Sequence, residues 1–95
     1  MGVQKRLPKR NPIKDGITEE EYNNMVAKQN NKCLICDITF DTSKMNSRDY
    51  PCVDHDHATG KIRGILCGCC NKGLGLFYDN IENLNSAITY LRIRG

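Results

Sequence analysis

Two pairs of cysteines with the same internal spacing constrain the fold of this chain more than any other feature. Two residues separate Cys33 from Cys36, and two separate Cys67 from Cys70. Such paired cysteines are the usual ligands of a tetrahedral zinc ion held by four thiolates. A chain of 95 residues forms one small domain with a marginal hydrophobic core, so a bound metal would add folding free energy that the core lacks. We therefore predict a single domain stabilised by zinc at these four cysteines.

The distance between the two pairs and the two remaining cysteines limit the alternatives. Thirty residues lie between Cys36 and Cys67, more than the roughly 15 to 20 of a simple zinc ribbon. We therefore expect a hairpin inserted between the pairs. Cys52 and Cys69 are left over, and Cys69 is an alternative ligand, although only Cys67 and Cys70 have the two-residue gap.

The sequence also bears on where the protein works. The amino terminus has no apolar signal segment, and no stretch approaches the ~20 apolar residues of a membrane span. We therefore expect a cytoplasmic protein without a membrane partner. Structural disulfides are uncommon in that reducing compartment, which favours metal binding by the cysteines.

Positive charge is concentrated near the amino terminus. The net charge is +3, yet residues 1–14 hold five basic side chains and no acidic one, against nine basic and eleven acidic groups in the rest. Pro8, Pro12 and the low apolar content predict a flexible arm over residues 1–16, ahead of a domain over residues 17–95. Such an arm can follow a DNA backbone, or it can simply aid solubility. Its predicted DNA contacts are Lys5, Arg6, Lys9 and Arg10.

Local sequence patterns predict a helix followed by a hairpin. Thr18 and Glu21 have the spacing of a capping box, and apolar residues recur at helical spacing after them, which predicts a helix over residues 19–29. A polar, turn-rich loop leads to two short apolar segments at residues 51–55 and 61–66, which we predict to pair as strands of a β-hairpin.

The rest of the chain is predicted to be helical, with different support in its two halves. Residues 67–76 contain three glycines, each of which weakens a helix by about 1 kcal/mol relative to alanine, so a helix here would need a metal to anchor its start. Asp79 and Glu82 have the spacing of a second capping box. The residues that follow form an apolar stripe that we expect to join the core, namely Ile81, Leu84, Ile88 and Leu91.

A run of acids and imidazoles at the end of the first predicted strand indicates hydrolytic chemistry. Asp54, His55, Asp56 and His57 are consecutive, and Asn71 directly follows a predicted zinc ligand. A neutral imidazole can take a proton from water near neutral pH, and the oxygen atoms of Asp54 and Asn71 suit magnesium. Magnesium would stabilise charge that develops on a phosphate and its leaving oxygen. The sequence thus indicates two metals, one structural and one catalytic.

These motifs together resemble a known family. The stretch from about residue 17 to residue 91 is similar to the phage recombination endonuclease VII family of His-Me finger (ββα-metal) nucleases. The resemblance rests on the first cysteine pair, on the acid and imidazole run, on Thr59-Gly60-Lys61-Ile62-Arg63-Gly64-Ile65-Leu66-Cys67 and on Cys70-Asn71. It implies a four-cysteine zinc that holds a β-hairpin against a helix.

The resemblance also implies roles for single residues. His55 would be the general base that activates water, and Asp54 and Asn71 would bind catalytic magnesium, for which manganese should substitute. His57 would be an accessory group near the phosphate, and Arg63 a phosphate contact. Lys61 and Lys72 are further basic side chains predicted to contact DNA. Members of the family cleave DNA phosphodiesters to leave 5′-phosphate and 3′-hydroxyl ends, and the founding member resolves branched DNA.

Two departures from the junction-resolving member limit how much of its specificity we expect. That member has an active-site glutamate three residues after its asparagine, where this chain has Leu74. It also continues into a long helical region for dimerisation and junction binding, whereas this sequence ends at Gly95. We therefore expect the nuclease chemistry to be kept better than the preference for junctions.

The sequence leads to one main hypothesis and two alternatives. The main hypothesis is a magnesium-dependent DNA endonuclease of α+β fold, a monomer or weak homodimer from a phage or prophage, which nicks duplex DNA or cuts branched DNA. The second is a zinc-stabilised DNA-binding module without turnover. The third is a structural zinc knuckle whose acid and imidazole run binds a regulatory metal. Intact Asp54, His55 and Asn71 favour the first, because a binding module has no need for that combination.

Overall fold

The computed structural model describes residues 16–95, which form a small α+β domain as predicted. Along the chain come α2 (Glu19–Lys28), β1 (Pro51–His55), β2 (Ile62–Cys67), α3 (Gly68–Leu76) and α4 (Ile81–Arg94). The predicted basic arm, with Lys5, Arg6, Lys9 and Arg10, lies outside the described residues.

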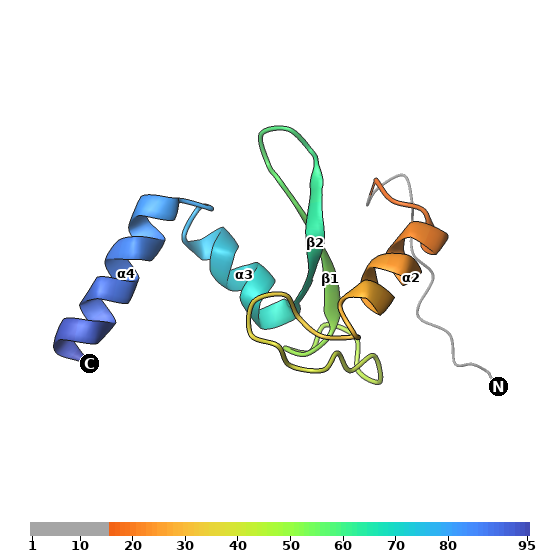
Figure 1. The fold of residues 1–95 in the computed structure, drawn as a ribbon, viewed down its shortest axis with the longest axis horizontal. Coiled ribbons are helices and arrows are strands. Elements are labelled where there is room, and N and C mark those ends of the chain that lie inside the picture. Colours follow the sequence, from red (N-terminus) through yellow and green to blue (C-terminus); the bar gives the residue numbers. More distant parts are fainter. Residues whose placement is uncertain (1–15) are drawn as a thin grey trace.

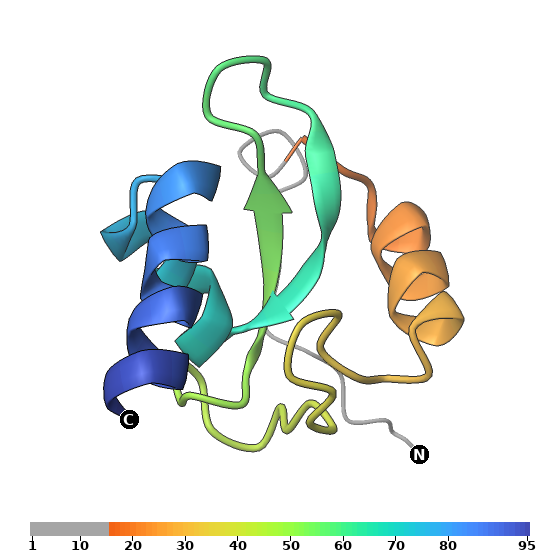
Figure 2. The ribbon, with the colours of Figure 1, turned by 60° about the vertical axis from the view of Figure 1, so that its left-hand side comes forward.

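The β-hairpin stands at the centre of the domain, with α2 on one side and α3 on the other (Figures 1 and 2). β1 and β2 form a two-stranded antiparallel sheet, close to the predicted strands. α2 packs against β2, and α3 packs against both strands. The core lies between α2, the hairpin and the loop after α2, and consists of Ile17, Tyr22, Cys33, Phe40, Ile65, Leu66 and Cys67.

The first helix has the predicted start. The hydroxyl of Thr18 accepts a hydrogen bond from the backbone N–H of Glu21 at 3.0 Å, and the carboxylate of Glu21 accepts one from the N–H of Thr18 at 2.9 Å. Both halves of the capping box are therefore present. Ile17 and Tyr22 are buried on either side of the cap, which fixes the direction in which the chain enters the helix.

The residue that ends α2 also ties it to the hairpin. The amide nitrogen of Gln29 donates to the carbonyls of Lys32 and Ile65, each at 2.9 Å, and its amide oxygen accepts from the N–H of Ile65 at 3.1 Å. These bonds satisfy backbone groups of β2, a strand whose other edge pairs with β1. One side chain therefore takes the place of a third strand at this position.

The hairpin contains a β-bulge at the end nearest the loop. Asp54 pairs with Gly64 and His55 pairs with Ile62, so Arg63 is an extra residue on β2. A bulge of this kind bends the strand and changes the direction of a side chain. Here it lies directly opposite the acid and imidazole run.

The glycine-rich segment is helical, and its start coincides with the second cysteine pair. Cys67 is the N-cap of α3, and its sulfur accepts a hydrogen bond from the N–H of Cys70. A Cβ atom on Gly68 would lie 2.8 Å from the carbonyl oxygen of Ser47. The loop before β1 can approach α3 this closely only because residue 68 is glycine.

The last helix differs from the sequence expectation in its cap and in its burial. Asn80 caps α4 by accepting from the N–H of Asn83 at 2.8 Å, so the predicted capping role of Asp79 is wrong. The predicted core stripe is also wrong, because Ile81 is 72% exposed and Leu91 is 65% exposed. α4 follows α3 at the end of the domain away from α2 (Figure 1), where the hairpin core does not reach it.

None of the helices in residues 16–95 has the length and apolar character that crossing a membrane requires.

Two glycines of α3 provide a matched test of this packing. We expect Gly68→Ala to destabilise the domain by about 1–3 kcal/mol, because the new methyl group would press on backbone that cannot rotate away. Gly73→Ala meets nothing within 4 Å and should stabilise the domain by about 1 kcal/mol through helix propensity. Denaturant unfolding of the metal-loaded protein measures both. Equal effects of the two substitutions would contradict the close approach at Gly68.

Candidate metal centre and active site

The four cysteines of the two predicted pairs come together at the base of the hairpin. The sulfur atoms of Cys33, Cys36, Cys67 and Cys70 all lie within 4.8 Å of one another, and those of Cys36 and Cys67 are 3.7 Å apart. A tetrahedral zinc site with Zn–S bonds of 2.3 Å requires sulfur atoms about 3.8 Å apart. The cluster can therefore hold a structural metal such as zinc.

The surroundings of the cluster suit thiolates rather than disulfides. None of the six cysteines, all of which lie in residues 16–95, forms a disulfide bond. The sulfur of Cys33 accepts a hydrogen bond from the N–H of Ile35 at 3.4 Å, and that of Cys67 accepts one from Cys70 at 3.3 Å. Such N–H···S bonds stabilise negative charge on sulfur, as a zinc knuckle requires.

The pKa values of two cysteines of the cluster, Cys33 and Cys70, shift in opposite directions. Burial acts to raise the pKa of Cys33, but hydrogen bonds from the backbone of Cys36, Cys67 and Ile35 outweigh it and lower that pKa to about 6. Burial, together with contact with the other thiols, raises the pKa of Cys70 well above its usual value. A bound divalent cation would favour the thiolate form of the sulfurs that ligate it.

The predicted alternative ligand Cys69 is not part of the cluster. It is exposed, and its N–H donates to the carbonyl of Arg48 at 3.1 Å. Cys52 and Cys69 instead line an open cavity of about 560 Å³, between the loop before β1 and the start of α3. Asn71 and Lys72 line the same cavity. Asn71 lies in the first turn of α3, directly after the cluster residue Cys70.

Asp54 is the buried carboxylate of the predicted catalytic run. Its side chain is only 10% exposed, and both of its oxygens accept hydrogen bonds from Arg63. The distances are 2.7 Å from Nε to Oδ2 and 3.1 Å from Nη2 to Oδ1. Hydrogen bonding to Asp54 raises the pKa of Arg63 above its already high usual value, so this guanidinium is always charged. Arg63, predicted as a phosphate contact, is thus bound to a predicted metal ligand.

The other members of the run lie at the same end of the hairpin. His55 is the last residue of β1 and is half-buried. Asp56 has a structural role, because its carboxylate accepts from the N–H groups of Ala58 and Thr59 and shapes the loop. His57 is exposed, and its Nδ1 lies 3.8 Å from Oδ2 of Asp79. Lys61 is exposed in the same loop.

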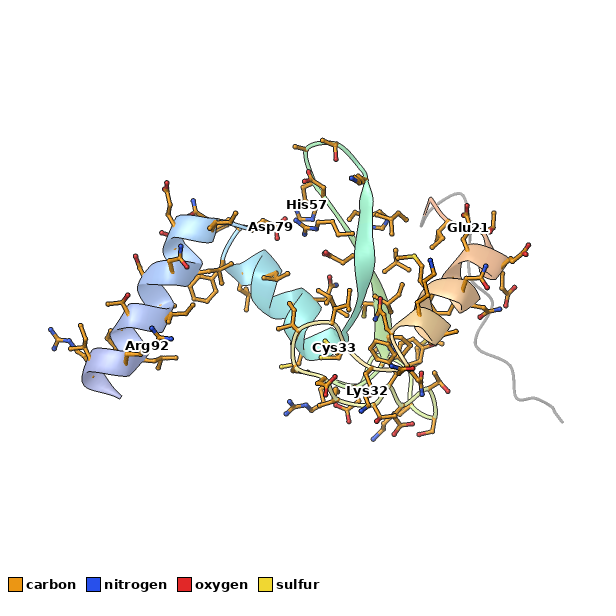
Figure 3. All side chains as sticks on the ribbon, viewed as in Figure 1. Glu21, Lys32, Cys33, His57, Asp79 and Arg92 are labelled. Atoms are coloured by element: carbon orange, nitrogen blue, oxygen red, sulfur yellow. The ribbon has the colours of Figure 1, made fainter. Side chains whose placement is uncertain are left out.

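Asp79 is the residue of this site that the sequence analysis missed. It was assigned to a helix cap, but its Oδ2 accepts a hydrogen bond from Nη2 of Arg63 at 3.2 Å. Figure 3 shows Asp79 and His57 side by side, one from the turn before α4 and the other from the hairpin loop. Nothing in the local sequence distinguishes this role from capping, because aspartate at this spacing suits a capping box equally well.

The chain has clear relatives among phage proteins. The family model for recombination endonuclease VII matches residues 8–93. The chain belongs to the recombination endonuclease VII family. It is 47% identical over 78 residues to the Gene 59 protein of Mycobacterium phage D29, and 44% identical over 77 residues to that of Mycobacterium phage L5. These matches cover 81% and 80% of this chain but only 44% of each relative. The chain therefore spans less than half the length of these two relatives.

The metal centre can be tested with two neighbouring cysteines. We expect Cys70→Ser to abolish stoichiometric zinc binding and the cooperative thermal transition, because structural zinc contributes on the order of 10 kcal/mol to folding. Cys69→Ser, which changes a sulfur outside the cluster, should keep both. Zinc content by mass spectrometry and unfolding by circular dichroism are the measurements. A metal-free protein that still melts cooperatively would contradict this account.

Proposed function

We propose that this protein is a magnesium-dependent DNA endonuclease in which zinc is structural and His55 is the general base. The observation that carries the proposal is the position of Asp54. It is a buried carboxylate next to an imidazole, at the end of a hairpin anchored on a four-cysteine cluster, in a chain of an endonuclease family. Burial of an acid is costly unless charged partners satisfy it, and a pure binding module has no use for it.

The proposed ligands of magnesium come from two elements. Asp54 on β1 offers a carboxylate and Asn71 on α3 offers an amide oxygen, both hard ligands that suit Mg²⁺. α3 packs against β1, so the two residues belong to adjoining elements. When bound, Mg²⁺ would stabilise negative charge on the phosphate and on the leaving oxygen.

The proposed reaction is hydrolysis by an activated water. His55 accepts a proton from water while the water oxygen forms a bond to phosphorus. The bond between phosphorus and the 3′ oxygen breaks, and that oxygen takes up a proton from solvent. The products are a 5′-phosphate and a 3′-hydroxyl. Arg63, charged at every relevant pH, would offset the charge of the phosphate.

The substrate and setting are part of the same proposal. Two exposed basic side chains, Lys61 and Lys72, would contact neighbouring phosphates. Because Leu74 stands where the junction-resolving member has glutamate, we expect nicking of duplex DNA at least comparable with cleavage of four-way junctions.

The relatives come from phages, so we place the activity in the cytoplasm of a host cell. A monomer would nick one strand, and a weak homodimer could cut both.

The general base can be tested with a single substitution. His55→Ala should lower the rate of nicking of supercoiled plasmid by about 100-fold or more, because it removes proton transfer from water. DNA affinity and zinc content should remain as in the wild type. Asp54→Asn should give a comparable loss, while raising the magnesium concentration needed for the remaining activity. If His55→Ala weakens DNA binding as much as cleavage, His55 is a contact residue rather than the base.

The proposed arm can be tested by truncation. Each neutralised phosphate adds about 0.9 to the slope of log affinity against log salt. Deletion of residues 1–14, which removes five positive charges, should therefore flatten the salt dependence and weaken binding similarly on unrelated DNA sequences. The rate at saturating DNA should change little. An unchanged salt slope, measured by fluorescence anisotropy, would make the arm a solubilising tail.

A further inference from the structure

Asp79 makes two contacts with a part of the chain from which it is distant in sequence. Its Oδ2 accepts a hydrogen bond from Nη2 of Arg63 at 3.2 Å and lies 3.8 Å from Nδ1 of His57. Arg63 belongs to β2 and His57 to the hairpin loop, whereas Asp79 lies in the turn between α3 and α4 (Figure 3). One carboxylate thus joins the helical half of the domain to the catalytic end of the hairpin.

The turn that carries Asp79 has an uncommon backbone conformation. Tyr78 and Asp79 both have left-handed conformations, with φ of 56° and 55°, which is uncommon for a bulky residue such as tyrosine. The N–H of Asp79 donates to the carbonyl of Leu74 at 2.9 Å, so the turn folds back over the end of α3. The cap of α4 is supplied by Asn80. The side chain of Asp79 is therefore not needed by its own helix, and only 20% of it is exposed.

The contacts hold Arg63 in one orientation and leave part of its guanidinium available. Asp54 binds Nε and Nη2, and Asp79 binds Nη2 from a second direction. Within residues 16–95, these hydrogen bonds do not involve Nη1, which has two N–H groups. A guanidinium fixed on two carboxylates and open at Nη1 is suited to donate to a phosphate oxygen.

We propose that Asp79 is a positioning residue of the active site: it holds the Arg63 guanidinium, and the nearby His57, where the DNA phosphate binds. This rests on the proposed endonuclease function and adds a residue to it. Without Asp79, Arg63 would keep its bonds to Asp54 but lose its second anchor. The phosphate would then lose more stabilisation in the transition state than in the bound ground state. The effect should therefore fall on the cleavage rate more than on DNA affinity.

The variants separate positioning from stability. Asp79→Asn removes the charge while keeping the shape, Asp79→Glu keeps the charge, and Arg63→Met removes the proposed intermediary. Glu82→Gln is the matched control, because it removes one negative charge from the exposed first turn of α4. Asp79→Asn should melt within a few degrees of the wild type, since a partly exposed ion pair adds little stability.

The measurements are single-turnover nicking of supercoiled plasmid by zinc-loaded protein in Mg²⁺, and binding of a labelled duplex in EDTA. Asp79→Asn should lower the nicking rate about tenfold and the affinity less than about threefold, because it loosens orientation rather than binding. Asp79→Glu should recover most of the rate, and Glu82→Gln should match the wild type. In the Arg63→Met background, Asp79→Asn should have less than about a twofold further effect, because both changes remove one interaction.

Three results would overturn the proposal. They are a rate for Asp79→Asn equal to that of Glu82→Gln, full additivity with Arg63→Met, and a large fall in melting temperature that accounts for the lost activity. If the wild type does not nick DNA at all, the proposed function fails, and nitrogen-15 NMR still tests the contact. The Nη2–H signal of Arg63, the group that donates to Asp79, is identified by its absence in Arg63→Met and should move in Asp79→Asn but not in Glu82→Gln. An unmoved signal would show that Asp79 does not hold Arg63.

Discussion

The meeting of four sulfur atoms at the base of the hairpin is the interaction on which the rest of the structure depends. It joins the loop after α2 to the end of β2 and the start of α3. Cys67 is at once the last residue of β2, the N-cap of α3 and a member of the cluster. A helix with three glycines between Cys67 and Leu76 gains its start from this cap rather than from propensity. The position of Asn71, one residue after the cluster, follows from the same interaction.

At the opposite end of the hairpin, ion pairs rather than apolar packing hold the elements together. The bulge at Arg63 lets an arginine from β2 reach the carboxylate of Asp54 on β1, and the turn before α4 brings Asp79 to the same guanidinium. Only Asp54 among these groups is well buried, so the network lies at the edge of the core. The domain therefore has one end where four sulfur atoms could bind a structural metal and another end where charged side chains meet.

The sequence predicted the features that depend on local rules. The cysteine spacing predicted the cluster, Thr18 and Glu21 predicted the cap of α2, and two short apolar segments next to turn-rich sequence predicted both strands within a residue. The wrong predictions concern the cap of α4 and the burial of its apolar stripe. In the first case two local rules compete, and in the second the outcome depends on which element packs against the helix. Asp79 and Asn80 are both good caps, and only tertiary contact with Arg63 separates their roles. The helical stripe of α4 indicates an apolar face but not what covers it, and it is exposed in the described part of the chain.

The account is tested most directly by separating the two metals in one experiment. Zinc-loaded protein is incubated with supercoiled plasmid after free divalent cations have been chelated, and Mg²⁺ is then restored. A closed four-sulfur site leaves no position for a catalytic water, whereas oxygen ligands bind Mg²⁺ reversibly. The account predicts open circular DNA only after Mg²⁺ is added, with zinc content unchanged throughout. Nicking in excess chelator while zinc is retained, or no nicking with both metals present, would contradict it.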